Sequence, residues 1–158
     1  MPDAVTVRMA REEEREAFLQ MALSSWLDAY DGLLPSAEVA DAPAMLQRAW
    51  VKRWRHFRVA ETSGALAGFY SLGDEGDDEE NNYLWHLYVD PAWHRRGIGT
   101  ALNRAALDEI ASRGAATAWL DVLAKNTKAL QFYRALGWHE IGPDLEDPAL
   151  VLMDIATR

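Results

Sequence analysis

Residues 87–100 read Leu-Tyr-Val-Asp-Pro-Ala-Trp-His-Arg-Arg-Gly-Ile-Gly-Thr, and the expected fold follows from this stretch. Its first three residues are typical of a strand, and Asp90-Pro91 ends that strand because proline cannot donate to a sheet ladder. Gly97 and Gly99 then begin a helix at which main-chain N–H groups can converge on an anion. Arg95-Arg96 adds positive charge beside these groups. The stretch therefore predicts a strand, turn and helix that bind phosphate.

Two familiar phosphate motifs do not fit this stretch. A dinucleotide-binding fingerprint needs Gly or Ala three residues after the second glycine, where Leu102 stands. A P-loop needs Gly-Lys followed by Ser or Thr, and this sequence contains no such run. A Gly-x-Gly turn alone is also compatible with a plain connection between a strand and a helix. A second stretch is needed to choose between these interpretations.

That second stretch is residues 126–138, Asn-Thr-Lys-Ala-Leu-Gln-Phe-Tyr-Arg-Ala-Leu-Gly-Trp, which follows a predicted strand at 117–122. Together the two stretches resemble the GNAT superfamily of N-acetyltransferases. Its signature is Arg or Gln, two residues and Gly-x-Gly or Gly-x-Ala after a Leu-Tyr-Val-like strand, then Asn-x-x-Ala-x-x-Phe-Tyr and Gly-Phe downstream. His94 stands in place of the usual Arg or Gln, and Trp138 in place of the last Phe. The resemblance is strong from residue 83 to about residue 142.

The resemblance implies acetyl-CoA as the cofactor, with CoA as product, and assigns residues to it. Strands 87–89 and 117–122 would splay apart and offer main-chain groups to the pantetheine arm, while amides of residues 95–100 would hold the pyrophosphate. Asn126 would bind pantetheine or hold the splayed strands, and Tyr133 would face the sulfur. The expected cofactor-binding residues are Leu87, Tyr88, Val89, His94, Arg95, Arg96, Gly97, Ile98, Gly99, Thr100, Asn126 and Tyr133.

Two residues are the candidates for catalysis, Tyr133 and His86. Proton donation from a tyrosine with a pKa near 10 to a thiolate near 8.5 is uphill by about 2 kcal/mol, so Tyr133 is expected to stabilise the leaving thiolate by hydrogen bonding. Related proteins often carry a Glu at the position of Tyr83, and that carboxylate is absent here. His86 is the candidate base in its place, because its ordinary pKa suits proton transfer at neutral pH. A purely structural role is the alternative for either side chain.

The sequence gives weaker signals for the residues that bind the acceptor amine. Trp26 and Tyr30, followed by Gly32-Leu33-Leu34-Pro35, match a pattern that one branch of the superfamily uses to wall its acceptor pocket, although a core stripe explains Trp26 equally well. Residues 73–82 hold six acidic side chains and predict a solvated loop, which would attract a cationic amine.

The expected fold class is α/β (α+β), a single N-acetyltransferase domain over residues 1–158. Periodicity and turn signals predict about four helices flanking a mixed, mostly antiparallel sheet of about six or seven strands with splayed central strands. The residues between 33 and 42 are expected to form a loop. The helices are expected at 12–30, 43–54, 97–113 and 126–136, and the strands at 5–7, 57–61, 65–72, 83–89, 117–122, 138–141 and 150–155.

Composition narrows the class of function. The chain has 158 residues, 49% of them hydrophobic, no cysteine and a net charge of −9. These values exclude a thiol nucleophile and cysteine-bound zinc, and they disfavour nucleic-acid or membrane partners. The four histidines, at 56, 86, 94 and 139, show no metal-ligand spacing, so no metal is expected. With no signal-peptide or membrane-span pattern, a cytoplasmic location is expected.

The sequence therefore predicts an enzyme that moves an acetyl group from acetyl-CoA directly to a primary amine, without a covalent acyl-enzyme. The acceptor is left as a small molecule or a peptide or protein amine, and dimerisation is left open. A noncatalytic acyl-CoA-binding regulatory module is the alternative, because the strand carboxylate is missing. Within catalysis, protein N-termini and lysines compete with polyamines and aminoglycoside-like molecules as acceptors.

Overall fold

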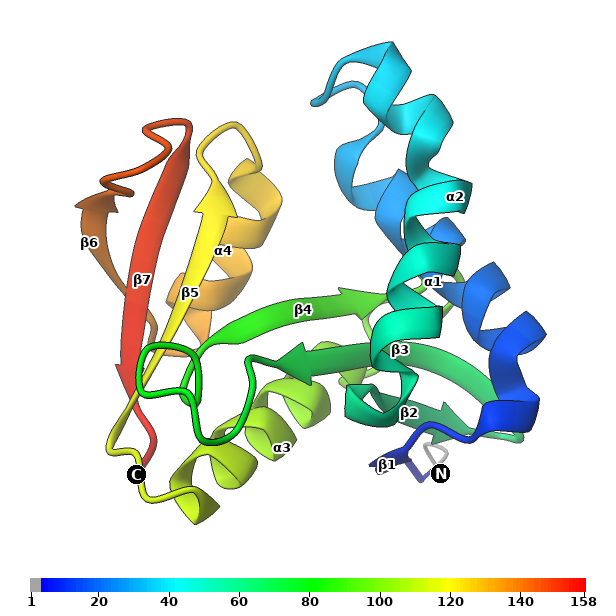
Figure 1. Cartoon of the computed structure of the whole chain (residues 1–158), viewed down its shortest axis with the longest axis horizontal. Coiled ribbons are helices and arrows are strands. Elements are labelled where there is room, and N and C mark those ends of the chain that lie inside the picture. Colours follow the sequence, from blue (N-terminus) through cyan, green and yellow to red (C-terminus); the bar gives the residue numbers. More distant parts are fainter. Residues whose placement is uncertain (1–3) are drawn as a thin grey trace. The chain divides into compact units, whose positions relative to one another are not determined.

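The computed structural model describes residues 4–158 (Figure 1). Within this part of the chain there are four α-helices, seven strands and three short 3-10 helices. The helices are α1 (Arg15–Tyr30), α2 (Ser36–Arg53), α3 (Ile98–Ser112) and α4 (Thr127–Ala135), with η1 (Glu12–Glu14), η2 (Trp54–His56) and η3 (Pro91–Trp93). The strands are β1 (Thr6–Met9), β2 (Arg58–Thr62), β3 (Ala65–Leu72), β4 (Leu84–Val89), β5 (Thr117–Leu123), β6 (His139–Pro143) and β7 (Leu150–Ala156).

The strands form two hydrogen-bonded sheets. One has the order β1-β2-β3-β4 and the other the order β5-β7-β6. The β1–β2, β2–β3, β5–β7 and β6–β7 pairs are antiparallel. The predicted α+β fold, with four helices and seven mostly antiparallel strands, is therefore confirmed. The two strands expected to splay, β4 and β5, belong to different sheets.

The chain divides into two compact units. The first contains residues 1–71 and 86–105, and the second contains residues 72–85 and 106–158. Both units are discontinuous in sequence, because residues 72–85 belong with the C-terminal segment.

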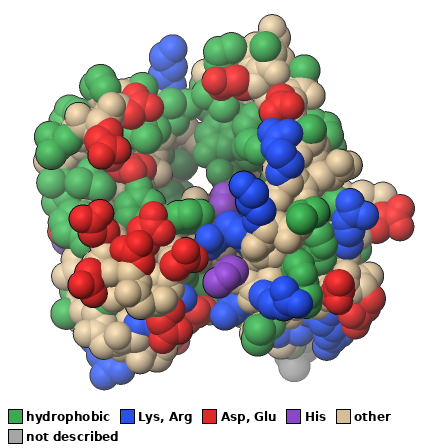
Figure 2. Space-filling view, viewed as in Figure 1, with side chains coloured by type: hydrophobic (Ala, Val, Ile, Leu, Met, Phe, Trp, Pro, Cys, Tyr) green, Lys and Arg blue, Asp and Glu red, His purple; other side chains and the backbone are tan. Residues whose placement is uncertain are grey.

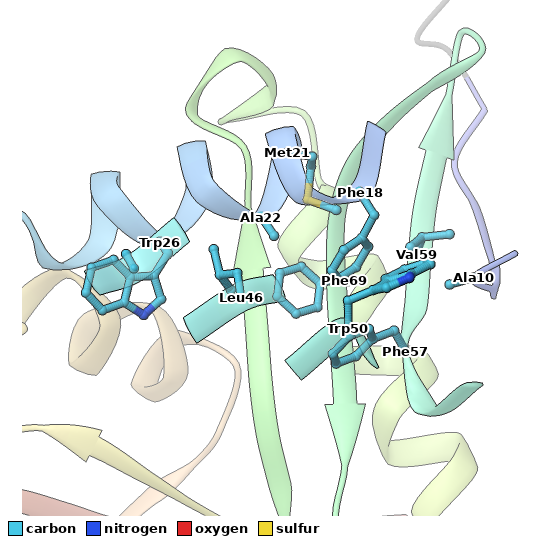
Figure 3. Close-up of a cluster of buried hydrophobic side chains, with 11 residues drawn as sticks. Ala10, Phe18, Met21, Ala22, Trp26, Leu46, Trp50, Phe57, Val59 and Phe69 are labelled. Atoms are coloured by element: carbon cyan, nitrogen blue, oxygen red, sulfur yellow. The ribbon is translucent and has the colours of Figure 1, made fainter. Parts of the chain in front are cut away.

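An aromatic core holds the first unit together (Figure 3). Phe18 of α1 stacks on Phe57 with ring centroids 4.8 Å apart, and it meets the ring of Phe69 of β3 edge-on at 4.9 Å. Trp50 of α2 packs against the same Phe18 at 5.0 Å. Aromatic pairs of this kind contribute about 0.5–1.5 kcal/mol each beyond burial. The core therefore fixes α1 and α2 against the β2–β3 hairpin.

The start of α2 differs from the prediction. Residues 33–42 were expected to be loop and Pro43 to stand in the first turn, but the helix begins at Ser36 and Pro43 lies inside it. Pro35 precedes the helix, and its carbonyl accepts from the N–H of Val39 at 3.1 Å. Ala42 is fully buried in the aromatic core. We infer that this burial and the alanine-rich sequence offset the hydrogen bond that an internal proline removes.

The second unit is built on the β5–β7 pair and α4. The side chains of β5 alternate between buried and half-buried, and the fully buried Met153 of β7 lies opposite Leu120. Tyr133 of α4 packs edge-on against Trp138 at 5.8 Å. These contacts hold α4 against the sheet of this unit.

The acidic loop, residues 73–82, is closed at its neck. The N–H of Gly73 donates to the carbonyl of Tyr83 at 2.8 Å. The guanidinium of Arg113 donates to the carbonyls of Gly73 and Asn81, both at 2.9 Å. A Cβ at Gly73 would lie 2.2 Å from the carbonyl oxygen of Glu80, so this close approach requires glycine.

Candidate functional site

The glycine turn of the first unit has the geometry of an anion site. Arg95 and Gly97 have left-handed backbone conformations, with φ of 64° and 79°, and α3 begins at Ile98. The first intrahelical hydrogen bond runs from the N–H of Ala101 to the carbonyl of Gly97 at 3.0 Å. The N–H groups of residues 98–100 precede that bond and have no acceptor within the helix. No acidic residue stands in the first turn, so these residues fit a pyrophosphate.

The side chains around the turn take different positions. Arg95 and Arg96 are exposed, and the guanidinium of Arg96 lies 5.0 Å from the centre of the Trp93 ring. His94, which stands at the position of the signature Arg or Gln, donates from its Nε2 to the carbonyl of Val89 at 3.2 Å. The same nitrogen lies 3.7 Å from Asp28 of α1. His94 therefore ties the turn to the end of β4.

The strand before the turn is held closely by its neighbour. A Cβ at Gly68 of β3 would lie 2.6 Å from the carbonyl oxygen of Tyr88, so only glycine permits this approach. The hydroxyl groups of Tyr88 and Tyr30 share a hydrogen bond of 2.9 Å. Trp26 packs on Tyr30 at 4.9 Å and belongs to the buried core of this unit. The two acceptor-side candidates thus meet β4 through Tyr30.

His86 lies in an aromatic environment of the first unit. Its ring packs near Phe57, Phe69 and Tyr88, and its Nδ1 is hydrogen-bonded to Ser71 Oγ at 2.5 Å. Burial, with a smaller contribution from the charge of Arg53, lowers the pKa of His86 to about 4. The imidazole is therefore uncharged at neutral pH.

The second unit contains Asn126 and Tyr133. The side-chain oxygen of Asn126 accepts from the N–H of Ala129 at 3.1 Å and so caps the N-terminus of α4. Tyr133 lies about two turns further along the helix and is 9% exposed. The cap gives Asn126 a structural role that is independent of any contact with pantetheine.

The structure adds a group that the sequence did not single out. The hydroxyl of Tyr83, just before β4, donates to Oδ2 of Asp121 in the middle of β5. Tyr83 stands at the position where related proteins often carry a Glu. The hydrogen bond from its hydroxyl places the carboxylate of Asp121 at the end of the tyrosine side chain. The sequence signal was the acid at the centre of an otherwise apolar strand, Thr-Ala-Trp-Leu-Asp-Val-Leu at residues 117–123.

Asp121 has an unusual environment. Its Oδ1 is buried and meets no hydrogen-bond donor among residues 4–158. Burial and the neighbouring carboxyl of Asp144 raise the pKa of Asp121, while the hydroxyl of Tyr83 opposes the rise. Asp144 differs, because main-chain N–H groups of Glu146 and Asp147 donate to it and lower its pKa.

The acidic loop is solvated, as the sequence predicted. Five of its acidic residues, Asp74, Glu75, Asp77, Asp78 and Glu79, are exposed. Figure 2 shows acidic side chains gathered on the drawn face of the second unit, which contains this loop. Among the described residues, no group of three or more His, Asp or Glu side chains is arranged to hold a metal ion. Within the same residues, no helix combines the length and apolar character that crossing a bilayer requires.

Comparison with known proteins identifies the family. Residues 15–138 match the acetyltransferase (GNAT) family. The chain belongs to this family. It is 33% identical over 121 residues to the [ribosomal protein bS18]-alanine N-acetyltransferase of Escherichia coli, covering 68% of this chain and 80% of that protein. It is 34% identical over 101 residues to N-alpha-acetyltransferase RimI of Mycobacterium tuberculosis, covering 63% of this chain and 62% of the other.

The fold of this GNAT protein also matches solved structures. The crystal structure of the PaiA N-acetyltransferase of Thermoplasma acidophilum with coenzyme A superimposes with a TM-score of 0.78 at 21% identity, over 97% of this chain and 99% of that one. The chain is therefore an acetyl-CoA-dependent N-acetyltransferase whose acceptor is an amine. This result favours the enzyme over the noncatalytic alternative.

Proposed function

We propose that this GNAT enzyme acetylates the α-amine of protein N-termini, with residues 1–158 acting as one N-acetyltransferase domain. The observation that carries the proposal is the 33% identity over 80% of the length of the bS18-alanine N-acetyltransferase. The mycobacterial N-alpha-acetyltransferase, at 34% identity, supports the same class of acceptor. A cytoplasmic location, expected from the sequence, would give the enzyme access to newly made N-termini.

The chemistry of the acceptor supports an α-amine over a lysine. An α-amine has a pKa near 8, so about a tenth of it is neutral at pH 7, whereas a lysine with a pKa near 10.4 is neutral in only about one molecule in 2,500. The candidate base His86 has a pKa lowered to about 4 and removes protons weakly. An acceptor that is already partly neutral makes the smaller demand on such a site.

The cofactor supplies an acetyl group activated as a thioester. We assign its pyrophosphate to the main-chain N–H groups of residues 98–100 with Arg95 and Arg96, as the fit of that turn supports. The strand residues Leu87–Val89 are assigned to the pantetheine arm. Tyr133 is assigned to the leaving sulfur, to which its hydroxyl donates a hydrogen bond. Direct transfer to the amine needs no acyl-enzyme.

Two groups compete for the proton of the acceptor amine. His86 is the residue the sequence suggests, and Asp121 is the one the contacts of Tyr83 suggest. A carboxyl whose pKa is raised becomes a better base near neutral pH, whereas burial has the opposite effect on an imidazole. If His86 is the base, His86→Ala removes the acidic limb of the rate profile; a limb that persists assigns the proton to another group.

A small cationic amine is the second candidate acceptor, favoured by the five exposed acids of the acidic loop. The test offers three acceptors with acetyl-CoA: a lysine-free peptide with N-terminal alanine, the same peptide with a blocked N-terminus and one lysine, and a polyamine. Release of CoA thiol and the mass of the product are measured. We expect turnover of the first peptide alone. Turnover of the polyamine instead would replace this proposal, and absence of stabilisation by acetyl-CoA would contradict the cofactor assignment.

A further inference from the structure

The turn that we propose to bind phosphate is held by one face of α1. Ser24 and Asp28 lie four residues apart on this helix, so their side chains share a face. Ser24 Oγ donates to Oδ1 of Asp90, the first residue of the turn, at 3.3 Å. Oδ2 of Asp28 lies 3.7 Å from Nε2 of His94, which stands three residues before Gly97. The helix therefore contacts the turn at two points.

The two points of contact differ in kind. Oδ1 of Asp90 also accepts from the N–H of Ala92 at 3.0 Å, and the N–H of Asp90 donates to the carbonyl of Ala67 in β3 at 2.8 Å. His94 is exposed, and its Nε2 donates to the carbonyl of Val89 at 3.2 Å. The contact at His94 is therefore the one that contains an imidazole, the side chain that ordinarily changes its charge near neutral pH.

The hydrogen bond to Val89 fixes which nitrogen of His94 gains a proton. A carbonyl oxygen only accepts, so Nε2 carries a hydrogen whether the ring is neutral or charged. Nδ1 is then the nitrogen that takes up the proton when the ring becomes charged. The bond to Val89 survives this change, so the imidazole keeps its place while its charge changes.

The charged groups near His94 are of both signs. Asp28 of α1 approaches its Nε2, and an acid at this distance favours the charged ring. Asp90 lies at the start of the same turn, and the exposed Arg95 and Arg96 follow His94 directly. A charged His94 therefore adds a third positive side chain to a turn that already carries two.

The family signature uses two kinds of residue at this position of the turn. An Arg is charged and a Gln is neutral, and both can donate a hydrogen bond. A protonated histidine corresponds to the Arg, and a neutral histidine corresponds to the Gln. His94 can therefore change from one kind to the other with pH.

We propose that His94 is a positioning residue whose protonation, favoured by Asp28, strengthens the binding of acetyl-CoA as pH falls through the range in which imidazoles titrate. The proposal rests on the assignment of the pyrophosphate to the N–H groups of residues 98–100. By linkage, an anionic ligand held at this turn favours the protonated ring, and the protonated ring favours the ligand. Because His94 and Asp28 are both exposed, the effect on Kd is about two- to fivefold at low ionic strength.

The test measures the Kd of acetyl-CoA by isothermal titration at about pH 5.5 and about pH 8 for the full chain, His94→Arg and His94→Gln. The parent is expected to bind as tightly as His94→Arg at the lower pH and as weakly as His94→Gln at the higher pH. Comparison at each pH cancels the titration of the cofactor's own phosphate, which falls in the same range. A parent whose Kd keeps a constant ratio to both variants would overturn the proposal.

The substitutions at His94 have a matched control. His56→Gln changes another exposed histidine of the first unit and should bind acetyl-CoA as the parent does at both pH values. Arg and Gln are the residues that the signature itself uses at the position of His94. A general loss of structure would weaken binding at both pH values, whereas the expected differences appear at one pH for each variant.

Asp28→Asn tests the second residue of the pair, with Kd measured at intermediate pH values as well. Loss of the acid should move the midpoint of the pH dependence to lower pH, because the charged ring loses its partner. Asp31→Asn removes the same charge three residues further along the chain and should keep the midpoint of the parent. An unchanged midpoint in Asp28→Asn would overturn the role of Asp28.

Gly99→Val separates this proposal from the cofactor assignment on which it rests. If Gly99→Val weakens binding while His94→Arg and His94→Gln keep a constant ratio to the parent, the turn binds the cofactor and the proposal for His94 is wrong. If Gly99→Val binds acetyl-CoA as the parent does, the pyrophosphate lies elsewhere and both are wrong.

Discussion

The two units of this enzyme differ sharply in charge. The first unit carries eleven acidic and eleven basic side chains, whereas the second carries fourteen acidic and five basic ones. The whole net charge of −9 therefore belongs to the second unit. The turn that we propose to bind phosphate lies in the neutral unit, and Asp121 and the acidic loop lie in the anionic one.

This difference bears on a difficulty posed by the sequence. An anionic protein repels an anionic cofactor, but the excess negative charge belongs to a unit that does not contain the turn that we propose to bind phosphate. The same negative charge favours a cationic acceptor. An anionic cofactor and a cationic acceptor have opposite electrostatic demands, and the two units differ in charge in the corresponding sense.

The largest expected effect comes from Asp121→Asn in the anionic unit, which tests whether this carboxylate is the proton acceptor. Loss of a proton acceptor typically costs about 100- to 10,000-fold, and we expect kcat with the N-terminal alanine peptide to fall by that amount. Acetyl-CoA should still raise the melting temperature of the variant. Asp108→Asn, at an exposed position of α3, is the control. A near-parental kcat in Asp121→Asn would return the role of base to His86.

The neutral unit is tested by the pH dependence of stability. The pKa of His86 is about 4 in the folded protein and near 6.5 when unfolded, so the unfolded state binds the proton more readily. Stability therefore falls as pH drops from about 6.5 to about 4, by up to about 3 kcal/mol. His86→Phe should remove this part of the pH dependence in urea unfolding. His56→Phe, at an exposed histidine, should keep it, and equal slopes in the parent and His86→Phe would refute the buried, uncharged ring.

Gly99→Val tests whether the pyrophosphate of the cofactor binds to the turn in the neutral unit. A valine side chain would keep an anion from approaching the N–H groups at the start of α3, and we expect acetyl-CoA affinity to fall at least about tenfold. Isothermal titration measures the affinity directly. Ser112→Val, at the other end of the same helix, tests whether any added valine has this effect. Unchanged binding by Gly99→Val would place the pyrophosphate elsewhere.

The smallest expected effect comes from the acidic loop. Neutralising Glu75, Asp78 and Glu79 together, as Gln, Asn and Gln, should raise KM for an arginine-containing peptide about two- to threefold at low salt. The kcat should stay as in the parent, because these exposed side chains only attract the acceptor. The difference should vanish in high salt, and a salt-independent change would indicate direct contact instead.

Short-range patterns explain what the sequence predicted. The hairpin at 57–72, α3 and α4 follow from turn residues, caps and apolar spacing, and the structure places each within about two residues of its expected bounds. The error at Pro43 has a tertiary cause, because core burial of Ala42 continues the helix through the proline. Asp121 was missed because its partner Tyr83 is 38 residues away and pairs with it only in the fold. The charge difference between the units could not be predicted either, because each unit combines segments that are far apart in the sequence.

The closed neck of the acidic loop has a practical consequence for redesign. Gly73, Asn81 and Arg113 hold the two ends of the loop together through hydrogen bonds that do not involve its exposed acidic side chains. The intervening residues can be exchanged as a cassette of different length or sign, provided Gly73 is kept. Grafting a basic or neutral cassette would then retune which amines the enzyme attracts, without rebuilding its scaffold.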